Sequence, residues 1–258
     1  MSLDITAYCQ RIGYTGSLEP TTAVLRELHR KHLETVPFEN LDIHIKRPIV
    51  LDETALYQKI VQQQRGGFCY ELNGLFAQLL STLGFEVDRL SAGVSNGEGS
   101  FGPDFDHMLL RVRCVDSPED WLADVGFGDC FLEPLRFVLD EEQEQANGSY
   151  RIEQGETPYY VLYRRPLGKD WNIEHRFTLE PQPLEAFNEM CQYQQTSPQS
   201  HFTQRAVCSR VTPDGRITLR DDRLIVTRGT ERIEYSIADR NAYHQALLQH
   251  FGISLPTA

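Results

Sequence analysis

The spacing of apolar residues predicts helices in the first ninety positions. One helix begins after Thr21 or Thr22, either of which can cap it, and ends before Pro37. A second begins after Asp52. The third is the clearest, because its apolar positions recur at i, i+3, i+4 and i+7 until Gly84 stops the pattern. Those positions are Leu72, Leu75, Phe76, Leu79, Leu80 and Leu83.

After residue 84 the pattern changes to short β-branched and aromatic segments separated by turns, which predict strands. The acidic, amide-rich residues 141–148 are expected to form an exposed loop, and residues 238–251 a closing helix. The chain therefore divides into a helical part (1–90), a β-rich part (91–200) and an α/β part (201–258), an α+β organisation. The expected strands cover residues 85–94, 107–115, 121–127, 159–163, 205–211, 216–219 and 224–227.

Charge and composition exclude several classes of protein. Among 258 residues, 25 Lys and Arg against 37 Asp and Glu give a net charge of −12 without a basic cluster, which argues against nucleic-acid binding. No run approaches about 18 apolar residues, so we expect no membrane span, and the first residues lack a signal-peptide pattern. The six cysteines show no CxxC spacing, so we expect no metal site and reduced thiols in a cytoplasmic protein.

Cys69 stands apart from the other cysteines because Gly66 and Gly67 shortly precede it and an amphipathic helix begins at it. The first turn of a helix presents unpaired N–H groups and the positive end of the dipole, and both favour a thiolate nucleophile. The glycines permit a tight entry and leave room for a substrate. A buried structural cysteine is the competing interpretation, and the pattern alone leaves both open.

A nucleophilic thiol needs a base and a group that orients the base. His107 opens a predicted strand at the rim of a sheet, whereas His29, His32, His244 and His250 fall on helices with charged neighbours and are expected to be solvated.

Asp124 follows apolar residues within another predicted strand, so its carboxylate requires a partner, which is either a histidine or an arginine. A hairpin that pairs Val115 with Trp121 sets Asp124 opposite Val112, about 16 Å along the strand from His107. A shared site therefore needs a bulge, a bend or a different pairing.

Residues 97–102 read Gly-Glu-Gly-Ser-Phe-Gly and match the GxGxxG pattern of dinucleotide sites. That fingerprint must follow a strand and open a helix, but here Pro103 and a strand come next. We therefore do not expect a Rossmann site.

Taken together, four segments resemble the arylamine N-acetyltransferases, in family order and at family-like separations. The resemblance runs from near the N-terminus to about residue 220. It implies a helical bundle, a β-barrel and an α/β lid around a Cys-His-Asp triad of the papain and transglutaminase kind. The segments are Val36-Pro37-Phe38-Glu39-Asn40-Leu41-Asp42, Arg65-Gly66-Gly67-Phe68-Cys69-Tyr70-Glu71-Leu72-Asn73-Gly74, His107-Met108-Leu109-Leu110 and Asp124-Val125-Gly126-Phe127-Gly128.

By this resemblance Cys69 is the nucleophile, His107 the base and Asp124 its orienter, which implies a bent or non-simple pairing of their strands. Phe38, Phe127 and Phe202 are the candidates for holding an aromatic ring, and Glu39 and Arg65 are expected to pair beneath the site as structural support.

The implied reaction is a ping-pong transfer. Acetyl-CoA acetylates the cysteine, and an arylamine, arylhydroxylamine or hydrazine then takes the acetyl group. Acetyl-CoA is thus a co-substrate, and no tightly bound cofactor is expected. The sequence shows no basic cluster for CoA, so backbone N–H groups are expected to hold its pyrophosphate.

Three features depart from the family pattern: Asp106 before the histidine, Asp129 after Gly128, and a short C-terminal tail. Three alternatives therefore stay open. An amide synthase of the same fold acts on a larger acyl thioester, and a shorter tail leaves room for one. A cysteine peptidase or transglutaminase uses the same triad, and a non-enzymatic protein can hold such a set by chance.

Overall fold

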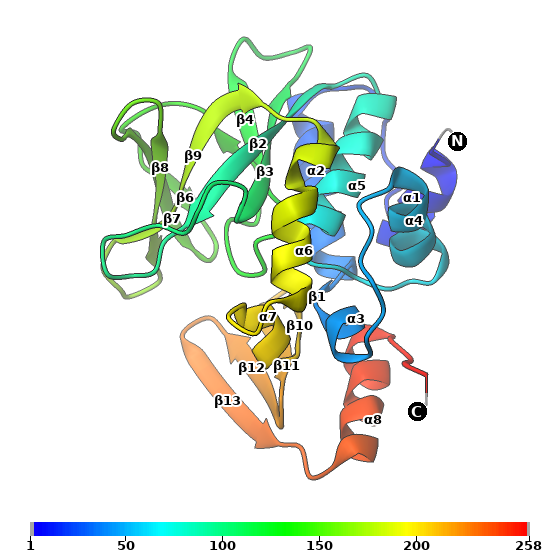
Figure 1. Cartoon of the computed structure of the whole chain (residues 1–258). Coiled ribbons are helices and arrows are strands. Elements are labelled where there is room, and N and C mark those ends of the chain that lie inside the picture. The colour runs from blue at the N-terminus through cyan, green and yellow to red at the C-terminus, as the bar shows by residue number, and fades with distance from the viewer. Residues whose placement is uncertain (1–2, 257–258) are drawn as a thin grey trace.

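The computed structural model describes residues 3–256, and its N-terminal part is a layer of helices (Figure 1). The predicted caps form: the Thr21 side chain accepts from the N–H of Val24, and Asp52 accepts from Thr54 and Ala55. These caps satisfy donors that a helix leaves unpaired at its start. The elements are α1 (Ile5–Ile12), α2 (Thr22–Thr35), α3 (Leu41–His44), α4 (Glu53–Tyr57), the π-helical turn η1 (Gln58–Gln62) and α5 (Cys69–Thr82).

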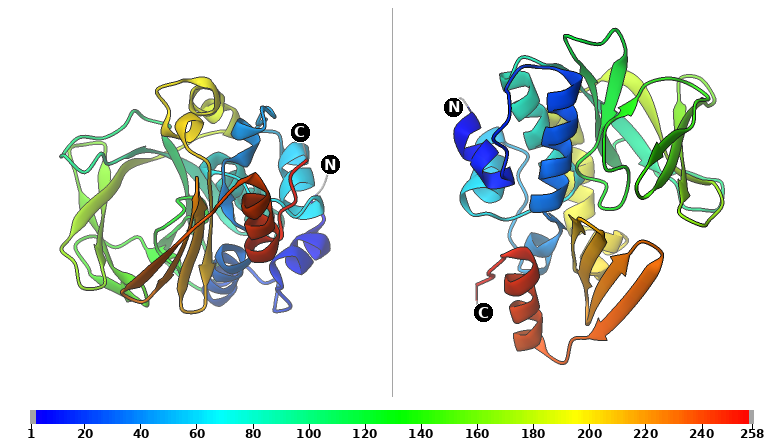
Figure 2. Two further views of the ribbon diagram at one scale, coloured as in Figure 1. Left: turned by 90° about the horizontal axis from the view of Figure 1, so that it is seen from below. Right: turned by 180° about the vertical axis from the view of Figure 1, so that it is seen from behind.

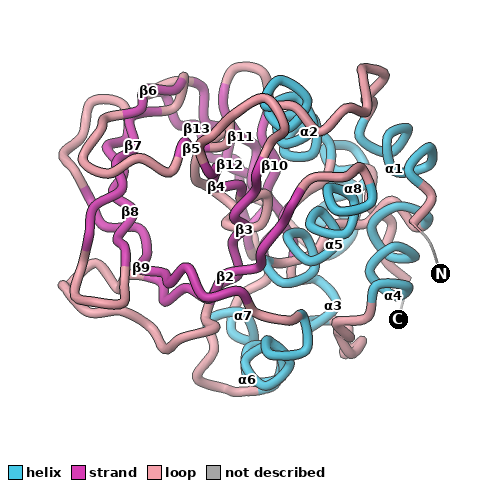
Figure 3. Tube along the Cα trace, turned by 90° about the horizontal axis from the view of Figure 1, so that it is seen from above, coloured by secondary structure: helices cyan, strands magenta, loops and turns pink. Residues whose placement is uncertain are grey.

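An eight-stranded antiparallel sheet curls into a nearly closed barrel beside these helices (Figure 3). Its strand order is β5-β4-β3-β2-β9-β8-β7-β6. The strands are β2 (Glu86–Val94), β3 (His107–Arg113), β4 (Asp120–Ala123), β5 (Leu135–Arg136), β6 (Gln143–Gln145), β7 (Gly148–Gln154), β8 (Tyr160–Pro166) and β9 (Asn172–Pro181).

A second sheet, ordered β1-β10-β11-β12-β13, lies below the barrel, with α8 against one face (Figures 1 and 2). We call β10–β13 and α8 the lid. Helices and barrel together confirm the expected α+β fold, whereas the boundaries at residues 90 and 200 stay a prediction. The remaining elements are β1 (Phe38–Glu39), η2 (Leu184–Phe187), α6 (Asn188–Thr196), α7 (His201–Gln204), β10 (Val207–Thr212), β11 (Gly215–Arg220), β12 (Arg223–Arg228), β13 (Glu231–Ser236) and α8 (Arg240–Phe251).

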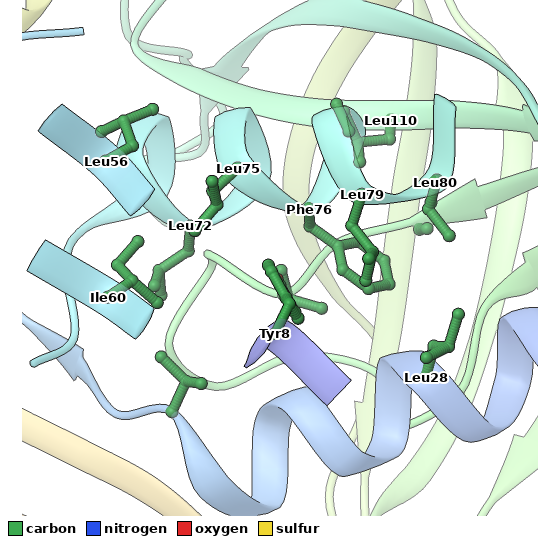
Figure 4. Packing of buried hydrophobic residues seen from close by; sticks show 14 of the residues in the cluster. Tyr8, Leu28, Leu56, Ile60, Leu72, Leu75, Phe76, Leu79, Leu80 and Leu110 are labelled. Carbon is green, nitrogen blue, oxygen red and sulfur yellow. The ribbon is translucent and has the colours of Figure 1, made fainter. Parts of the chain in front are cut away.

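Helix α5 is the centre of the main hydrophobic core (Figure 4). Almost every residue from Cys69 to Leu80 is buried, because the helix packs against α1 and α4 and also against β2 and β3 of the barrel. Phe76 and Leu79 face Tyr8 of α1 in Figure 4. A helix enclosed in this way places its first turn at a fixed position relative to the barrel.

The pairing of β3 with β4 differs from the expected hairpin. Val112 pairs with Trp121 and Leu110 with Ala123, a register shifted by three residues from the predicted one. The strand ends early because Val115 turns out to solvent and its N–H donates to Pro20 O at 3.0 Å. Asp124 therefore follows β4 beside the first residues of β3, and the expectation of a bent or non-simple pairing is wrong.

The segment expected to be an exposed loop at 141–148 instead contributes β6 and the seam of the barrel. The Gln143 side chain pairs with the backbone N–H and C=O of Arg136 on β5 at 2.8 and 3.0 Å. Gln145 binds the backbone of Leu132 and Glu133 in the same manner. Amide side chains thus replace a strand ladder between the two edge strands, which an amide-rich composition does not reveal.

His29 and His32 were expected to be solvated, and this is wrong: both are fully buried where α2 packs under the barrel and α5. The Nδ1 atom of His29 lies 3.0 Å from Leu132 O, and its Nε2 lies 3.1 Å from both the carbonyl oxygen and the N–H of Asp124. Burial lowers the pKa of His29 to about 4, so the ring is neutral near pH 7.

This neutral histidine makes stability dependent on pH. Its pKa is about 6.5 in the unfolded chain and lower in the folded one, so below about pH 6.5 the unfolded state binds more protons and folding weakens. We expect the protonation of His29 in the unfolded chain to lower the free energy of unfolding by about 2 kcal/mol between pH 7.5 and pH 5. Urea unfolding of the wild type and His29→Gln at both pH values measures it. An equal decrease in the free energy of unfolding in the two proteins would show that His29 is not its source.

Candidate active site

Cys69 is the first residue of α5, and close backbone packing determines where it lies. A Cβ at Gly66 would come within 1.9 Å of Pro37 O, and one at Gly67 within 2.8 Å of the Glu71 carboxylate. The two glycines therefore leave room for the protein's own backbone and for Glu71, rather than for a substrate. The Glu71 carboxylate in turn accepts the N–H of Phe68 at 3.1 Å and caps the helix.

The thiol of Cys69 is buried, and this burial raises its pKa well above the usual value. The carboxylates of Asp106 and Asp124 raise this pKa further, whereas the backbone N–H of Met108 lowers it. The helix N-terminus alone does not produce a free thiolate here. Cys69 therefore needs a neighbouring base to remove its proton.

His107 and Asp124 are brought together as the resemblance implied. The Nε2 atom of His107 lies 2.7 Å from Asp124 Oδ2, with both side chains buried. Within residues 3–256 the other ring nitrogen, Nδ1, makes no hydrogen bond. The imidazole thus has one nitrogen fixed by a carboxylate and the other free to exchange a proton.

Asp124 is buried, yet its carboxyl stays ionised. Burial alone would raise its pKa, but the charge and hydrogen bond of His107 and the hydrogen bond from Asn73 hold it below the usual range. The Oδ1 atom accepts from Asn73 Nδ2 at 2.8 Å and from the N–H of Gly126 at 2.9 Å. His29 fixes the backbone of the same residue. Such compensation is what a buried carboxylate requires.

Asn73 is a site residue that the sequence reasoning missed. Its amide donates to Met108 O at 2.6 Å as well as to Asp124, and its Oδ1 accepts the N–H of Val125 at 2.9 Å. It therefore joins α5, β3 and the loop after β4. The available signal was its position four residues after Cys69, which places both on one face of the helix.

Gly126 allows that loop to lie directly on the start of α5. A Cβ at this position would come within 2.8 Å of both Cys69 Cα and Asn73 Nδ2. The loop after β4 thus lies against Cys69, while the Asp124 carboxylate in the same loop binds His107. The three predicted residues share one site.

The three predicted aromatic residues also lie together, each half-buried. The rings of Phe38 and Phe202 are 6.2 Å apart, and Phe127 meets His107 edge-on at 5.0 Å. A Cβ added at Gly128 would lie 3.5 Å from the Phe38 ring, so the loop that carries Phe127 passes beside Phe38. Their partly exposed faces are suited to contact with an apolar ring.

His175 on β9 is a further residue that the sequence did not indicate. Its ring lies 5.7 Å from that of His107 and 5.4 Å from that of Phe127. Burial and, to a smaller degree, the charge of His107 lower its pKa to about 3. His175 is therefore neutral near pH 7.

A buried ionic network supports the site from below. The expected pair forms, with Arg65 Nε donating to Glu39 Oε1 at 2.9 Å, and Asp42 extends it to Lys59 at 2.8 Å. Lys59 also binds Glu71, the capping residue of α5, at 2.7 Å. The network fixes the segment that leads into Cys69, so its role is structural support.

The two acids that depart from the family pattern, Asp106 and Asp129, lie close to the site. Asp106 Oδ1 accepts from Gln194 Nε2 of α6 at 2.7 Å, and Gln194 in turn accepts from Ser200 Oγ at 2.6 Å. This chain of hydrogen bonds links the start of β3 to α7, which carries Phe202. Asp129 contacts two arginines and is considered below.

No group of His, Cys, Asp or Glu within residues 3–256 is arranged to hold a metal ion. In the same range, every helix is too short or too polar to cross a membrane.

A family model described as N-acetyltransferase matches residues 21–258. An arylamine N-acetyltransferase / N-hydroxyarylamine O-acetyltransferase of Salmonella typhimurium is 35% identical over 96% of this chain and 86% of its own length. The structure of the Mycobacterium tuberculosis arylamine N-acetyltransferase matches with a TM-score of 0.91 at 34% identity, over 97% of this chain and 94% of that one. The Mycobacterium marinum enzyme in complex with CoA matches at 0.89 and 31% identity, over 97% and 93%.

Replacing Asn73 tests how the site is held. In Asn73→Ala, Asp124 loses a hydrogen bond that lowers its pKa, and the loop loses its tie to α5. A hydrogen bond to a charged group contributes about 1.5–3 kcal/mol, so we expect iodoacetamide to label Cys69 at least about tenfold more slowly at pH 7. Gln78→Ala, at a half-buried position of α5 whose side chain binds Glu53 of α4, is the control. Labelling at the wild-type rate in a folded Asn73→Ala protein would rule out this role.

Proposed function

The chain belongs to the arylamine N-acetyltransferase family, and we propose that it transfers acetyl groups from acetyl-CoA to arylamines through Cys69. The observation that supports this assignment of residues is the buried His107–Asp124 pair at 2.7 Å, which the Asp124 loop joins to the first turn of α5. The amine acceptors proposed are arylamines, arylhydroxylamines and hydrazines.

In the first half-reaction, His107 Nδ1 takes the thiol proton of Cys69. The Sγ atom then bonds to the carbonyl carbon of acetyl-CoA, and the bond between that carbon and the CoA sulfur breaks. CoA leaves with the proton that His107 returns, and an acetyl thioester remains on Cys69. Asp124 stabilises the imidazolium that forms between these steps.

In the second half-reaction, the amine nitrogen attacks the acetyl-enzyme. An aromatic amine is a weak nucleophile that is mostly neutral at pH 7, so orientation and a base matter more than prior deprotonation. Phe38, Phe127 and Phe202 hold the ring while His107 removes the proton from the nitrogen. The bond from carbon to Sγ breaks, the amide leaves, and the thiol is restored.

We further propose that acetyl-CoA is released as CoA at each turnover and that no tightly bound cofactor takes part. All six cysteines are unpaired and buried, including the nucleophile. This is typical of a protein that works in a reducing compartment such as the cytoplasm.

The first test is intact-protein mass spectrometry after brief incubation with acetyl-CoA and no amine. We expect one added acetyl group in the wild type and in Cys114→Ala, a control at another buried cysteine, and none in Cys69→Ala. An aniline or a hydrazine should discharge it. In His107→Gln and Asp124→Asn, acetylation should be slower by about a thousandfold or more, because the base is lost or disoriented.

An adduct formed only with a longer acyl thioester would favour the amide synthase instead. Acetylation that survives in Cys69→Ala would reject Cys69 as the nucleophile.

A further inference from the structure

Two arginines from different sheets meet at the loop that follows the catalytic aspartate. Arg164 lies on β8 of the barrel and Arg216 on β11 of the lid (Figure 3). Between them is the carboxylate of Asp129, which follows Gly128. These residues are 35 to 87 positions apart in the chain, so no basic cluster is visible in the sequence.

One carboxylate oxygen serves both arginines. Asp129 Oδ1 lies 3.3 Å from Arg164 Nη2 and 3.4 Å from Arg216 Nε. Charge-assisted hydrogen bonds are normally about 2.7–2.9 Å long, and arginine binds an oxyanion best with two parallel N–H groups. Arg164 also donates its Nη1 to the backbone carbonyl of Asp129 at 2.8 Å, and Arg216 donates its Nη1 to Ser209 Oγ at 3.1 Å. Neither guanidinium makes a paired contact with the Asp129 carboxylate. A group with three oxygens, such as a phosphate, can offer both arginines paired contacts at once.

The two arginines are also stabilised unequally. Burial and the positive charge of Arg164 lower the pKa of Arg216 in spite of Asp129, whereas Asp129 and other neighbours raise the pKa of Arg164. The next acid, Glu174, is 3.8 Å from Arg164, and burial raises its pKa. Additional negative charge would therefore stabilise Arg216 most.

Other buried polar atoms near Arg164 have no partner within residues 3–256. These are its own Nε and the hydroxyl of Tyr150, whose ring centroid is 5.9 Å from the guanidinium. A buried donor without a partner is costly, and native proteins leave few of them.

Asp129 is the exposed member of this cluster. Its side chain is 60% exposed, whereas those of Arg164 and Arg216 are 10% and 15% exposed. An anion from solution would therefore meet the arginines by displacing this carboxylate. The same loop carries Phe127, which contacts His107. This loop thus links the arginine pair to a residue beside His107.

We propose that Arg164 and Arg216 bind phosphate groups of the acyl donor, and that Asp129 occupies this site in the free enzyme as an internal competitor. The inference rests on the proposed function, in which acetyl-CoA is the donor. Acetyl-CoA carries its phosphates at the end remote from the thioester, so it can contact the arginines while its thioester lies at Cys69. Asp129 then reduces the affinity for acetyl-CoA but not for donors without phosphate.

Two donors that give the same acetyl-enzyme separate this role from chemistry at Cys69. Acetyl-CoA carries phosphates, whereas p-nitrophenyl acetate has none. We expect the ratio of kcat/KM for acetyl-CoA to that for p-nitrophenyl acetate to fall about tenfold or more in Arg216→Gln and Arg164→Gln. In Asp129→Asn the ratio should rise several-fold, because the competitor loses its charge. Arg165→Gln, next to Arg164 but bound to Glu142, should leave the ratio unchanged.

Inorganic pyrophosphate is an independent probe that needs no acyl transfer. It should raise the Tm of the wild type, raise it more in Asp129→Asn and not raise it in a folded Arg216→Lys or Arg216→Gln protein. This measurement keeps the proposal testable if one arginine variant is unstable.

An equal loss of kcat/KM with both donors in the arginine variants would overturn the inference. The arginines would then serve only to link the barrel to the lid. A lower ratio in Asp129→Asn would overturn the competitor role. No acetyl-enzyme from either donor in the wild type would instead refute the proposed function, and this inference with it.

Discussion

The buried carboxylate of Asp124 is the constraint on which the site depends. An ionised group out of water is stable only if its charge and lone pairs are compensated. Here the compensation comes from His107, from Asn73 and from the N–H of Gly126, while His29 holds the backbone. These groups belong to α2, α5, β3 and the loop after β4. The same contacts that permit the charge therefore fix the helical layer against the barrel and aim the base.

Close approach of backbones is the second condition for this arrangement. Gly66 packs on Pro37 O, and Gly126 packs on Cys69, at distances that no side chain would allow. The segments before the nucleophile and after Asp124 are thereby pressed against each other. This explains why glycines flank the reactive residues on both sides. It also explains why the thiol is buried and why its pKa is raised.

The two acids that depart from the family pattern, Asp106 and Asp129, each connect elements that are far apart in the chain. Asp106 joins the start of β3 to α6 and α7 through Gln194, so it connects the base to the segment that carries Phe202. Asp129 connects the catalytic loop to both the barrel and the lid through arginines. A carboxylate that looks unsuited to an anionic donor is, in the proposal above, the group that occupies the phosphate site of the free enzyme. Both acids lie beside the triad without replacing any of its members.

Local patterns in the sequence determined much of this protein. The apolar period and the caps located α2, α4 and α5. The motifs around Cys69, His107 and Asp124 identified the family and indicated the candidate residues, because such signals are contained in a few neighbouring positions. The register of β3 and β4, the buried state of His29 and the role of Asn73 were decided by the tertiary structure. The tertiary structure also brought Arg164 and Arg216 together. Each of these depends on contacts between segments far apart in the chain, where packing and compensation of buried charge outweigh any local preference.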